Sequence, residues 1–289
     1  MSESAVPQTS GPETPEPETI IITGASDGIG AAAARALSAS GHNVVIVGRS
    51  PEKTAKVADA LGADRFVADF ARLSEVRRLA EQLLERYPRI DVLANNAGGI
   101  FGERTVTEDG HELTLQVNHL APFLLTNLLM DRLVGSRARV INTSSVANLS
   151  GRLDIDDLDL TRQFTAGRAY GNAKLDNILF TKELARRFGD QGVTTASFHP
   201  GVVASNFASE STSPLRWVYR GVLSRALISS EKGADTLVWL ATTTPGRDWV
   251  SGEYYIKRKP GRTNRQADDP QLASALWERS AVMVALSMK

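Results

Sequence analysis

The chain has 289 residues, of which 42% are hydrophobic and 23% charged, and its 33 Lys and Arg residues equal its 33 Asp and Glu residues. Such a chain is long and apolar enough to bury one large core. Because there is no basic excess, neither nucleic acid nor a membrane is an expected partner. The sequence has no cysteine, which excludes disulfides and thiolate catalysis, and its four scattered histidines predict no metal site.

The first 18 residues differ in composition from the rest of the chain. Residues 1–18 are rich in Pro, Ser, Thr and Glu, and they lack the basic and apolar regions of a secretory signal. We expect a short disordered tail. No run of eighteen apolar residues occurs in the sequence, since even 121–130 contains Asn127. These features predict a cytoplasmic protein.

From residue 19 onward, short apolar runs alternate with amphipathic runs. The apolar runs predict strands at 19–24, 43–48, 65–70, 90–98, 138–147, 192–201 and 252–258. The amphipathic runs predict helices at 29–40, 51–62, 74–87, near 108–134 and near 168–190. This alternation is typical of an α/β fold with a single doubly wound, Rossmann-type parallel sheet and helices on both faces. One domain, 19–289, is expected to bind its ligand beyond the carboxyl ends of the strands.

The stretch "TGASDGIG" directly follows the first predicted strand and opens the first helix. In a doubly wound fold this is the place of a phosphate-binding turn, where glycines let the main chain approach a pyrophosphate. The spacing of Gly24, Gly28 and Gly30 differs from Gly-x-Gly-x-x-Gly, but the physical reason is the same. We predict a dinucleotide site that also includes Ser26 and Ile29. The alternative is a tight strand-to-helix turn without a ligand.

The end of the second predicted strand indicates which dinucleotide binds. Proteins that bind NAD usually carry an acid there for the ribose 2′-hydroxyl, but this chain has Gly48 and Arg49. A guanidinium can bind a 2′-phosphate through two hydrogen bonds, so the pair favours NADP, with NAD as the second choice. Asp27 in the glycine turn argues slightly against NADP, and a plain surface arginine is the alternative interpretation of Arg49.

Tyr170 and Lys174 lie four residues apart at the start of a predicted helix. Residues at this spacing share a helix face, so the phenol and the ammonium can point into one site. A nearby ammonium favours the phenolate and brings a group that normally titrates near 10 closer to neutral pH. The alternative is a chance pair on a solvated surface.

The order of five short segments gives the chain a resemblance to a known family. These segments are "TGASDGIG", "NNAG" at 95–98, "INTSS" at 141–145, "YGNAK" at 170–174 and "HPGVV" at 199–203. The sequence resembles the short-chain dehydrogenase/reductase family over residues 19 to about 257. Within that family, 170–205 and "LWERS" at 276–280 are similar to the retinol-dehydrogenase-like branch. The resemblance implies an NAD(P)-dependent oxidoreductase and is compatible with a homodimer or homotetramer.

The resemblance implies further cofactor contacts outside the glycine turn. Besides Tyr170 and Lys174, the matching positions are Asp69, Phe70, Asn95, Ala97, Gly98, Pro200, Gly201, Val203 and Ser205. Asp69 would contact the adenine. The segment after residue 199 would flank the nicotinamide. The alternative is that "NNAG" and "HPG" are ordinary loop segments that contact no cofactor.

The resemblance also implies a catalytic set of Asn118, Ser145, Tyr170 and Lys174. Tyr170 would be the general acid and base, and Lys174 would lower its pKa and hold the cofactor ribose. Ser145 would bind the substrate oxygen, while Ser144 would bond locally to the backbone. Asn118 would hold a water that links Lys174 to solvent. The alternatives are a strand-end cap for Ser145 and a helix kink satisfied by backbone for Asn118.

Three further segments bear on the substrate and on metal binding. The apolar residues of 204–226 predict a substrate lid and a hydrophobic alcohol or ketone, although they could instead pack against the body or a second subunit. The aspartates of 152–160 alternate with Leu and Ile, which favours a solvated loop held by apolar anchors over a metal site. His199 is interpreted as a packed, hydrogen-bonded residue.

Two other functions are left open by the sequence. One is a non-catalytic dinucleotide-binding sensor or scaffold, which the intact catalytic set argues against. The other is a biosynthetic ketoreductase that acts on a polyketide-like or steroid-like compound. Nothing in the sequence separates these substrates.

Overall fold

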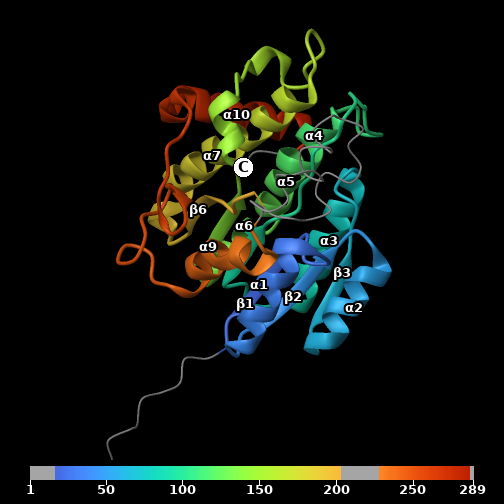
Figure 1. Cartoon of the computed structure of the whole chain (residues 1–289), viewed down its shortest axis with the longest axis vertical. Coiled ribbons are helices and arrows are strands. Elements are labelled where there is room, and N and C mark those ends of the chain that lie inside the picture. The colour runs from blue at the N-terminus through green and yellow to red at the C-terminus, as the bar shows by residue number, and fades with distance from the viewer. Residues whose placement is uncertain (1–16, 203–227, 287–289) are drawn as a thin grey trace, which may run out of the picture.

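A single sheet organises the part of the chain that the computed structural model describes, residues 17–202 and 228–286 (Figure 1). Its strands are β1 (Thr19–Thr23), β2 (Asn43–Gly48), β3 (Asp64–Val67), β4 (Val92–Asn95), β5 (Arg139–Thr143), β6 (Thr194–His199), β7 (Tyr254–Ile256) and β8 (Lys259–Pro260). The spatial order is β3-β2-β1-β4-β5-β6-β7-β8, and every neighbouring pair is parallel except β7 and β8. The predicted doubly wound sheet is therefore confirmed. The strand order reverses beside β1, which places a crevice beyond the carboxyl ends of β1 and β4.

Helices cover both faces of the sheet. They are α1 (Gly28–Ala39), α2 (Pro51–Leu61), α3 (Leu73–Arg86), α4 (Leu113–Leu115), α5 (Ala121–Leu128), α6 (Met130–Ser136), α7 (Ala166–Phe188), α9 (Ser230–Thr242) and α10 (Pro270–Met283). Along β1, Ile20 and Ile22 face a core shared with α1 and α9, whereas Ile21 faces a core shared with α3, α5, α7 and α10. This alternation is the period of two expected for a strand. Figure 1 shows α1 beside α9 and α10 beside α7.

The helix predicted near 108–134 is the least regular. It begins with α4, continues as a π-helical turn, η1 (Gln116–Leu120), and then forms α5 and α6. Pro122 explains part of this irregularity, because a proline has no N–H to donate to the carbonyl four residues earlier. The wider turn leads instead from the Ala121 N–H to the Gln116 carbonyl. The sequence pattern also did not indicate α9, α10 or the short antiparallel β8.

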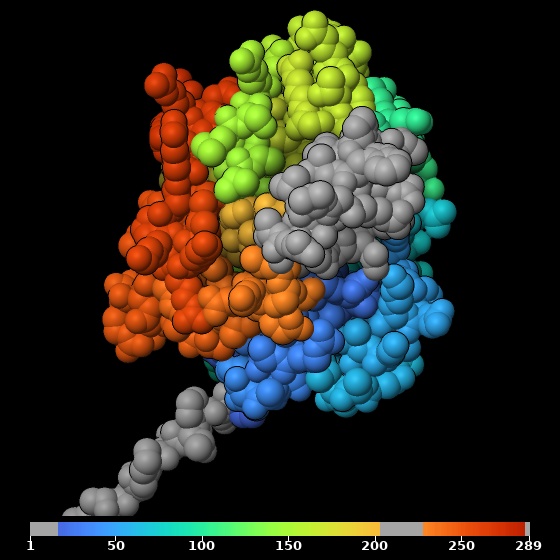
Figure 2. Space-filling view, in the orientation of Figure 1, coloured from blue at the N-terminus to red at the C-terminus, as the bar shows by residue number. Residues whose placement is uncertain are grey.

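The insert after β5 packs against the C-terminal segment. It contains two 3₁₀ turns, η2 (Val146–Ser150) and η3 (Ile155–Asp157), and Figure 2 shows its yellow-green residues beside the red C-terminal residues. Asn264, just before the turn η7 (Arg265–Asp268), donates from its main-chain N–H to the side chain of Asn148 over 2.9 Å. This contact closes one side of the molecule around the residues that follow β5.

Apolar anchors hold the insert, as predicted. Leu153, Leu158 and Leu160 are buried. The expectation of a solvated acidic loop is wrong for Asp157, because that carboxylate is buried and accepts hydrogen bonds from Thr161 and Arg162. Across residues 17–202 and 228–286, no group of three potential metal ligands comes together. No helix in the same residues is long and apolar enough to cross a membrane.

Candidate active site

The glycine turn between β1 and α1 leaves no room for side chains. Gly24 and Gly28 adopt positive φ angles of 66° and 53°, a conformation that favours glycine. A Cβ on Gly30 would lie 2.4 Å from the Gly24 carbonyl oxygen and 2.7 Å from Asn96 Nδ2. Asn96 donates to the main-chain carbonyl of Thr23 at 3.0 Å and so holds the turn against β4. The turn thus presents bare backbone at the start of α1, where an anion would be stabilised.

The end of β2 is equally restricted. A Cβ on Gly48 would lie 2.3 Å from Thr54 Oγ1 and 2.8 Å from Ser26 Cβ. An aspartate or glutamate, the residue typical of an NAD site, therefore cannot occupy this position without moving both neighbours. The next residue, Arg49, is exposed. The sequence alone did not show that Gly48 sterically excludes the acid that is typical of an NAD site.

Asp27 has two local roles beside this end of the crevice. Its side chain accepts a hydrogen bond from the Gly28 N–H at 2.7 Å, which caps α1. Its other carboxylate oxygen lies 3.7 Å from Lys53 Nζ on α2. Because a cation accompanies this carboxylate, Asp27 opposes a 2′-phosphate less than its sequence position suggests.

Lys174 is a buried cation at the centre of the crevice. Its side chain is 1% exposed, and its Nζ donates to the Thr143 carbonyl at 3.3 Å and lies 5.3 Å from the ring centre of Tyr170. Burial lowers the pKa of Lys174 to about 7. No ion pair to Lys174 occurs among the residues that the structure describes. A ligand hydroxyl or negative charge near this ammonium would offset the cost of burying it.

Asn118 lies in the π-helical turn and faces the same place. Its Oδ1 accepts from the Gly99 N–H at 3.2 Å, and its Nδ2 donates to the carbonyls of Gly99 and Thr114, both at 2.9 Å. A Cβ on Gly98 would lie 2.5 Å from Asn118 Oδ1 and 3.3 Å from Lys174 Nζ. The structure therefore brings Asn118 and Lys174 together across Gly98. The side chain of Asn118 is engaged with main chain, as the backbone-satisfied alternative expected.

The two serines at the end of β5 have different surroundings. Ser144 donates to the main-chain carbonyl of Lys174 at 2.7 Å and is buried, which fits the expected local role. Ser145 accepts from the Ala147 N–H at 3.2 Å and caps η2. This cap uses one acceptor position of the hydroxyl and leaves its proton for another partner. Capping and substrate binding by Ser145 are thus compatible.

The remaining expected cofactor residues divide by location. Asn95 is buried and donates to Asn142 and Thr126, which braces β4 against β5 and α5. Asp69 accepts from the Ala71 N–H within its own turn, and the Phe70 side chain is part of the core. Ala97, Gly98, Pro200 and Gly201 follow the carboxyl ends of β4 and β6. Val203, Ser205 and the lid at 204–226 lie outside the described residues.

His199 differs from the expectation. It is partly buried at the end of β6, and its Nδ1 has no hydrogen-bond partner among the described residues. Burial lowers its pKa to about 4. The predicted packing of His199 is confirmed, but the predicted hydrogen bond is wrong for Nδ1.

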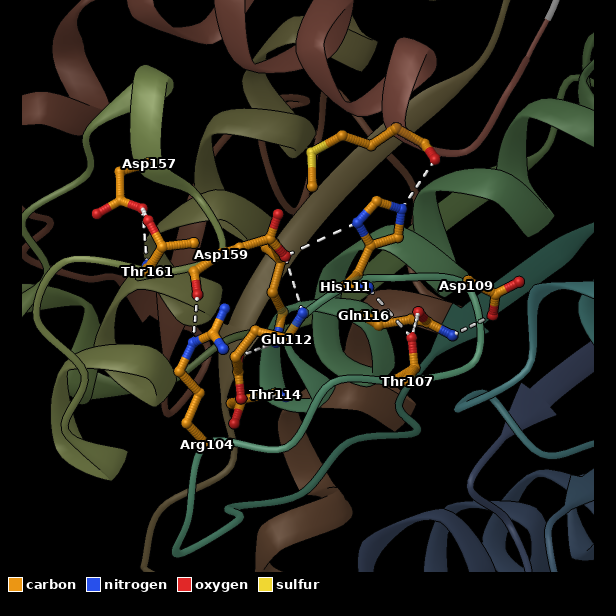
Figure 3. Close-up of polar contacts among 12 residues, drawn as sticks. Arg104, Thr107, Asp109, His111, Glu112, Thr114, Gln116, Asp157, Asp159 and Thr161 are labelled. Atoms are coloured by element: carbon orange, nitrogen blue, oxygen red, sulfur yellow. Dashed lines mark hydrogen bonds and ion pairs between the residues drawn. The ribbon is translucent and has the colours of Figure 1, made fainter.

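The sequence pattern does not reveal a polar cluster that we call the histidine cluster. It consists of His111, Asp159 and Arg104, which Figure 3 labels, and the Met283 carbonyl. His111 Nε2 lies 2.9 Å from that carbonyl, and its Nδ1 lies 3.7 Å from Asp159 Oδ1. Arg104 donates to the Asp159 main-chain carbonyl at 3.2 Å. The cluster joins the loop before α4, the insert and the C-terminal end of α10. Nothing in the sequence indicated that residues 104, 111 and 159 lie close together in the folded protein.

Comparisons with known proteins agree with this geometry. The family model described as "short chain dehydrogenase" matches residues 18–215. The chain belongs to the short-chain dehydrogenase/reductase family. It is 48% identical to DnrU of Streptomyces sp. (strain C5), provisionally named a daunorubicin C-13 ketoreductase, with 92% of each chain covered. It is 36% identical to retinol dehydrogenase 13 of Homo sapiens, with 93% of this chain and 85% of the relative covered.

Solved structures support the same assignment. An uncharacterised protein from Mycobacterium Paratuberculosis superposes with a TM-score of 0.75 at 30% identity, with 93% of each chain covered. The RhlG/NADP active-site complex of Pseudomonas aeruginosa superposes with a TM-score of 0.65 at 26% identity, covering 82% of this chain and 93% of the other. As a member of this family in its retinol-dehydrogenase-like branch, the chain is an NAD(P)-dependent oxidoreductase.

Proposed function

We propose that this enzyme reduces a ketone on a hydrophobic molecule with NADPH, and that Tyr170 supplies the proton. The observation that carries the proposal is the buried ammonium of Lys174, held 5.3 Å from the ring centre of Tyr170 without an ion pair in the described part of the chain. An unpaired buried cation is costly, so its presence beside a phenol favours a chemical role.

The residues of the crevice fit a nicotinamide dinucleotide. The bare glycine turn and the start of α1 suit a pyrophosphate, because only main chain lies there and the helix N-terminus favours an anion. The crowded position of Gly48 excludes an acid, and the exposed Arg49 can pair with a 2′-phosphate. These two features favour NADPH over NADH. When bound, the cofactor supplies the hydride.

The protein groups then have separate roles. Tyr170 donates a proton to the ketone oxygen, since negative charge would otherwise build up on that oxygen. The ammonium of Lys174 stabilises the phenolate that this donation leaves. The hydroxyl of Ser145 donates a hydrogen bond to the same oxygen and orients it toward Tyr170. Asn118 holds Gly99 and the turn beside Lys174 in place.

The rim of the crevice supports a hydrophobic substrate. Val146 and Leu149, just after Ser145, are 40% and 46% exposed, and Val202, just after Gly201, is 47% exposed. These side chains follow the carboxyl ends of β5 and β6, which are neighbouring strands. Exposed apolar side chains at the mouth of a site favour binding of an apolar molecule. The ketoreductase name of DnrU supports a ketone as the substrate.

A substrate screen tests the proposal. Purified protein with NADPH is offered polycyclic aromatic ketones, steroid ketones and small polar ketones, and the loss of reduced nicotinamide is followed by absorbance. We expect the highest kcat/KM on the polycyclic ketones and a clear preference for NADPH over NADH. Binding of NADPH without turnover on any carbonyl would instead support the non-catalytic sensor and overturn the proposal.

A further inference from the structure

Asn177 lies one helical turn after Lys174 and shares its surroundings. Its side chain is buried, and its Nδ2 donates to the Thr143 carbonyl at 3.0 Å and to the Asn118 carbonyl at 3.1 Å. The Thr143 carbonyl is also the acceptor for Lys174 Nζ, at 3.3 Å. Asn177 and Lys174 therefore bind the same main-chain oxygen from neighbouring positions on α7.

The sequence explains why the Asn118 carbonyl accepts from a side chain. In a regular α-helix this oxygen would accept from the N–H of residue 122, but residue 122 is proline and has no N–H. The π-helical turn at Gln116–Leu120 lies here. A buried carbonyl without a donor is costly, and Asn177 Nδ2 supplies one. Because Pro122 cannot donate to the Asn118 carbonyl, the Asn177 side chain is its donor instead.

A series of buried hydrogen bonds connects β4 and β5 to α7 at Asn177. Asn95 Nδ2 donates to Asn142 Oδ1 at 2.9 Å, and Asn142 Nδ2 donates to Thr181 Oγ1 at 2.9 Å. Thr181 Oγ1 in turn donates to the main-chain carbonyl of Asn177 at 2.7 Å. The series runs from β4 through β5 to α7. These buried bonds hold the backbone of α7 at Asn177 against β5, and they place the Asn177 amide within reach of the two carbonyls.

We propose that Asn177 is a positioning residue that occupies the inner acceptors beside Lys174 and so keeps the ammonium directed toward Tyr170. The inference rests on the proposed function, because it takes Lys174 to act on Tyr170. Without the Asn177 amide, the Asn118 carbonyl would lose this donor and the Thr143 carbonyl would keep only Lys174, so both oxygens would draw the ammonium inward. The phenol would then lose part of the positive charge that favours its ionised form.

Burial shifts the pKa values of the other titratable groups on these elements toward their neutral forms. Burial lowers the pKa of His119, in the π-helical turn, to about 4, although the nearby Asn177 side chain acts in the opposite direction. Burial raises the pKa of Asp176, on α7, well above its ordinary value, and burial also raises the pKa of Tyr254 on β7. Each of these shifts disfavours a charge that would compete with the ammonium of Lys174, which lies 5.3 Å from the ring centre of Tyr170.

Two variants test the proposal. Asn177→Leu removes both donors at similar size, and Asn177→Ala removes them without adding charge. For both we expect turnover to fall about tenfold and the midpoint of the pH–rate profile to move up by about 1 pH unit, because the phenol is ionised less readily. Affinity for NADPH, measured by nicotinamide fluorescence, should fall several-fold. If Asn177→Leu does not fold, the smaller Asn177→Ala carries the test.

Thr181→Val is the matched control. It removes two buried hydrogen bonds one turn further along the same helix, the one from Asn142 Nδ2 and the one to the main-chain carbonyl of Asn177. It leaves the Asn177 amide in place as the donor to the two carbonyls beside Lys174. We expect a loss of melting temperature without a shift of the pH midpoint. Equal pH profiles for Thr181→Val and both Asn177 variants would reduce Asn177 to a structural residue and overturn the inference.

Tyr170→Phe, measured in the same assays, distinguishes a failure of this inference from a failure of the proposed function. If it loses turnover while the Asn177 variants keep the parent's pH midpoint, the inference alone is wrong. If Tyr170→Phe keeps normal turnover, the proposed function fails first, since the pH midpoint then does not report on Tyr170.

Discussion

Two polar clusters, a buried one around Lys174 and the partly buried histidine cluster, stabilise positive charge in opposite ways. Around Lys174, the described partners are neutral: the Thr143 carbonyl and, beside it, the amide groups of Asn118 and Asn177. In the histidine cluster, His111 faces the carboxylate of Asp159 and the carbonyl end of α10. The first arrangement leaves the charge available to a ligand, whereas the second uses it to fasten three segments together.

The pKa values follow the same contrast. Burial lowers the pKa of Lys174 to about 7, because nothing among its described neighbours compensates for the lost water. The side chain of Asp159 is the largest cause that raises the pKa of His111, and it outweighs burial. A site that must change its charge during turnover benefits from the first environment, and a structural link benefits from the second.

Removal of the Tyr170 hydroxyl is the sharpest test of the reactive cluster. We expect Tyr170→Phe to lower turnover by roughly 10²–10⁴-fold, the usual effect of losing a positioned acid or base. Cofactor affinity should survive, because Lys174 and the glycine turn are untouched. Turnover is measured on the best substrate of the screen and affinity by nicotinamide fluorescence. Near-normal turnover would show that another group transfers the proton.

Adjacent serines offer a comparison within one strand end. Ser145→Ala should lower turnover by about 10²–10³-fold, since it removes a donor to the reacting oxygen. Ser144→Ala removes a bond to the Lys174 main chain and should lower turnover much less. Melting temperatures of both variants check that folding does not account for the difference. A larger kinetic loss in Ser144→Ala would reverse the assignment of the two hydroxyls.

Features that depend on residues close together in the sequence could be predicted, whereas contacts between distant residues could not. The parallel sheet, the glycine turn and the Tyr170–Lys174 pair follow from periodicity, glycine spacing and a shared helix face. The role of Asn177 does not, because it depends on a carbonyl freed by Pro122, 55 positions earlier in the numbering. The histidine cluster was not predicted either, because its members come together only through the packing of the insert and α10. Long-range polar contacts leave no periodic pattern to detect.

Cofactor choice tests whether charge at the opposite end of the crevice matters as proposed. Arg49→Asp should weaken NADPH binding by about 10–100-fold, because repulsion replaces a charge-assisted contact with the 2′-phosphate. NADH binding should change little. Arg262→Asp makes the same change of charge at an exposed arginine beyond β8 and should leave the preference unchanged. Equal losses for both cofactors in Arg49→Asp would remove Arg49 from the 2′-phosphate site.

The smallest expected effect concerns the histidine cluster, and it depends on pH. The folded-state pKa of His111 is raised, first by the side chain of Asp159 and, against burial, also by the Met283 carbonyl. Burial raises the pKa of Asp159, but the interaction with His111 and the Glu112 N–H outweigh it and leave that pKa lowered. Protonated His111 therefore stabilises the fold below its unfolded pKa of about 6.5, and this contribution is lost as pH rises through the higher folded value.

We expect His111→Gln to lower the free energy of unfolding by about 1 kcal/mol near pH 6, where a partly buried pair and a helix C-terminus contribute on this order. The loss should shrink as the pH rises to about 9. Urea unfolding at both pH values measures it, and Asp159→Asn serves as the partner variant because its amide oxygen can still accept from the Glu112 N–H. If the double variant loses the sum of the two single losses at pH 6, the residues act independently and the cluster does not fasten the insert to α10 through this pair.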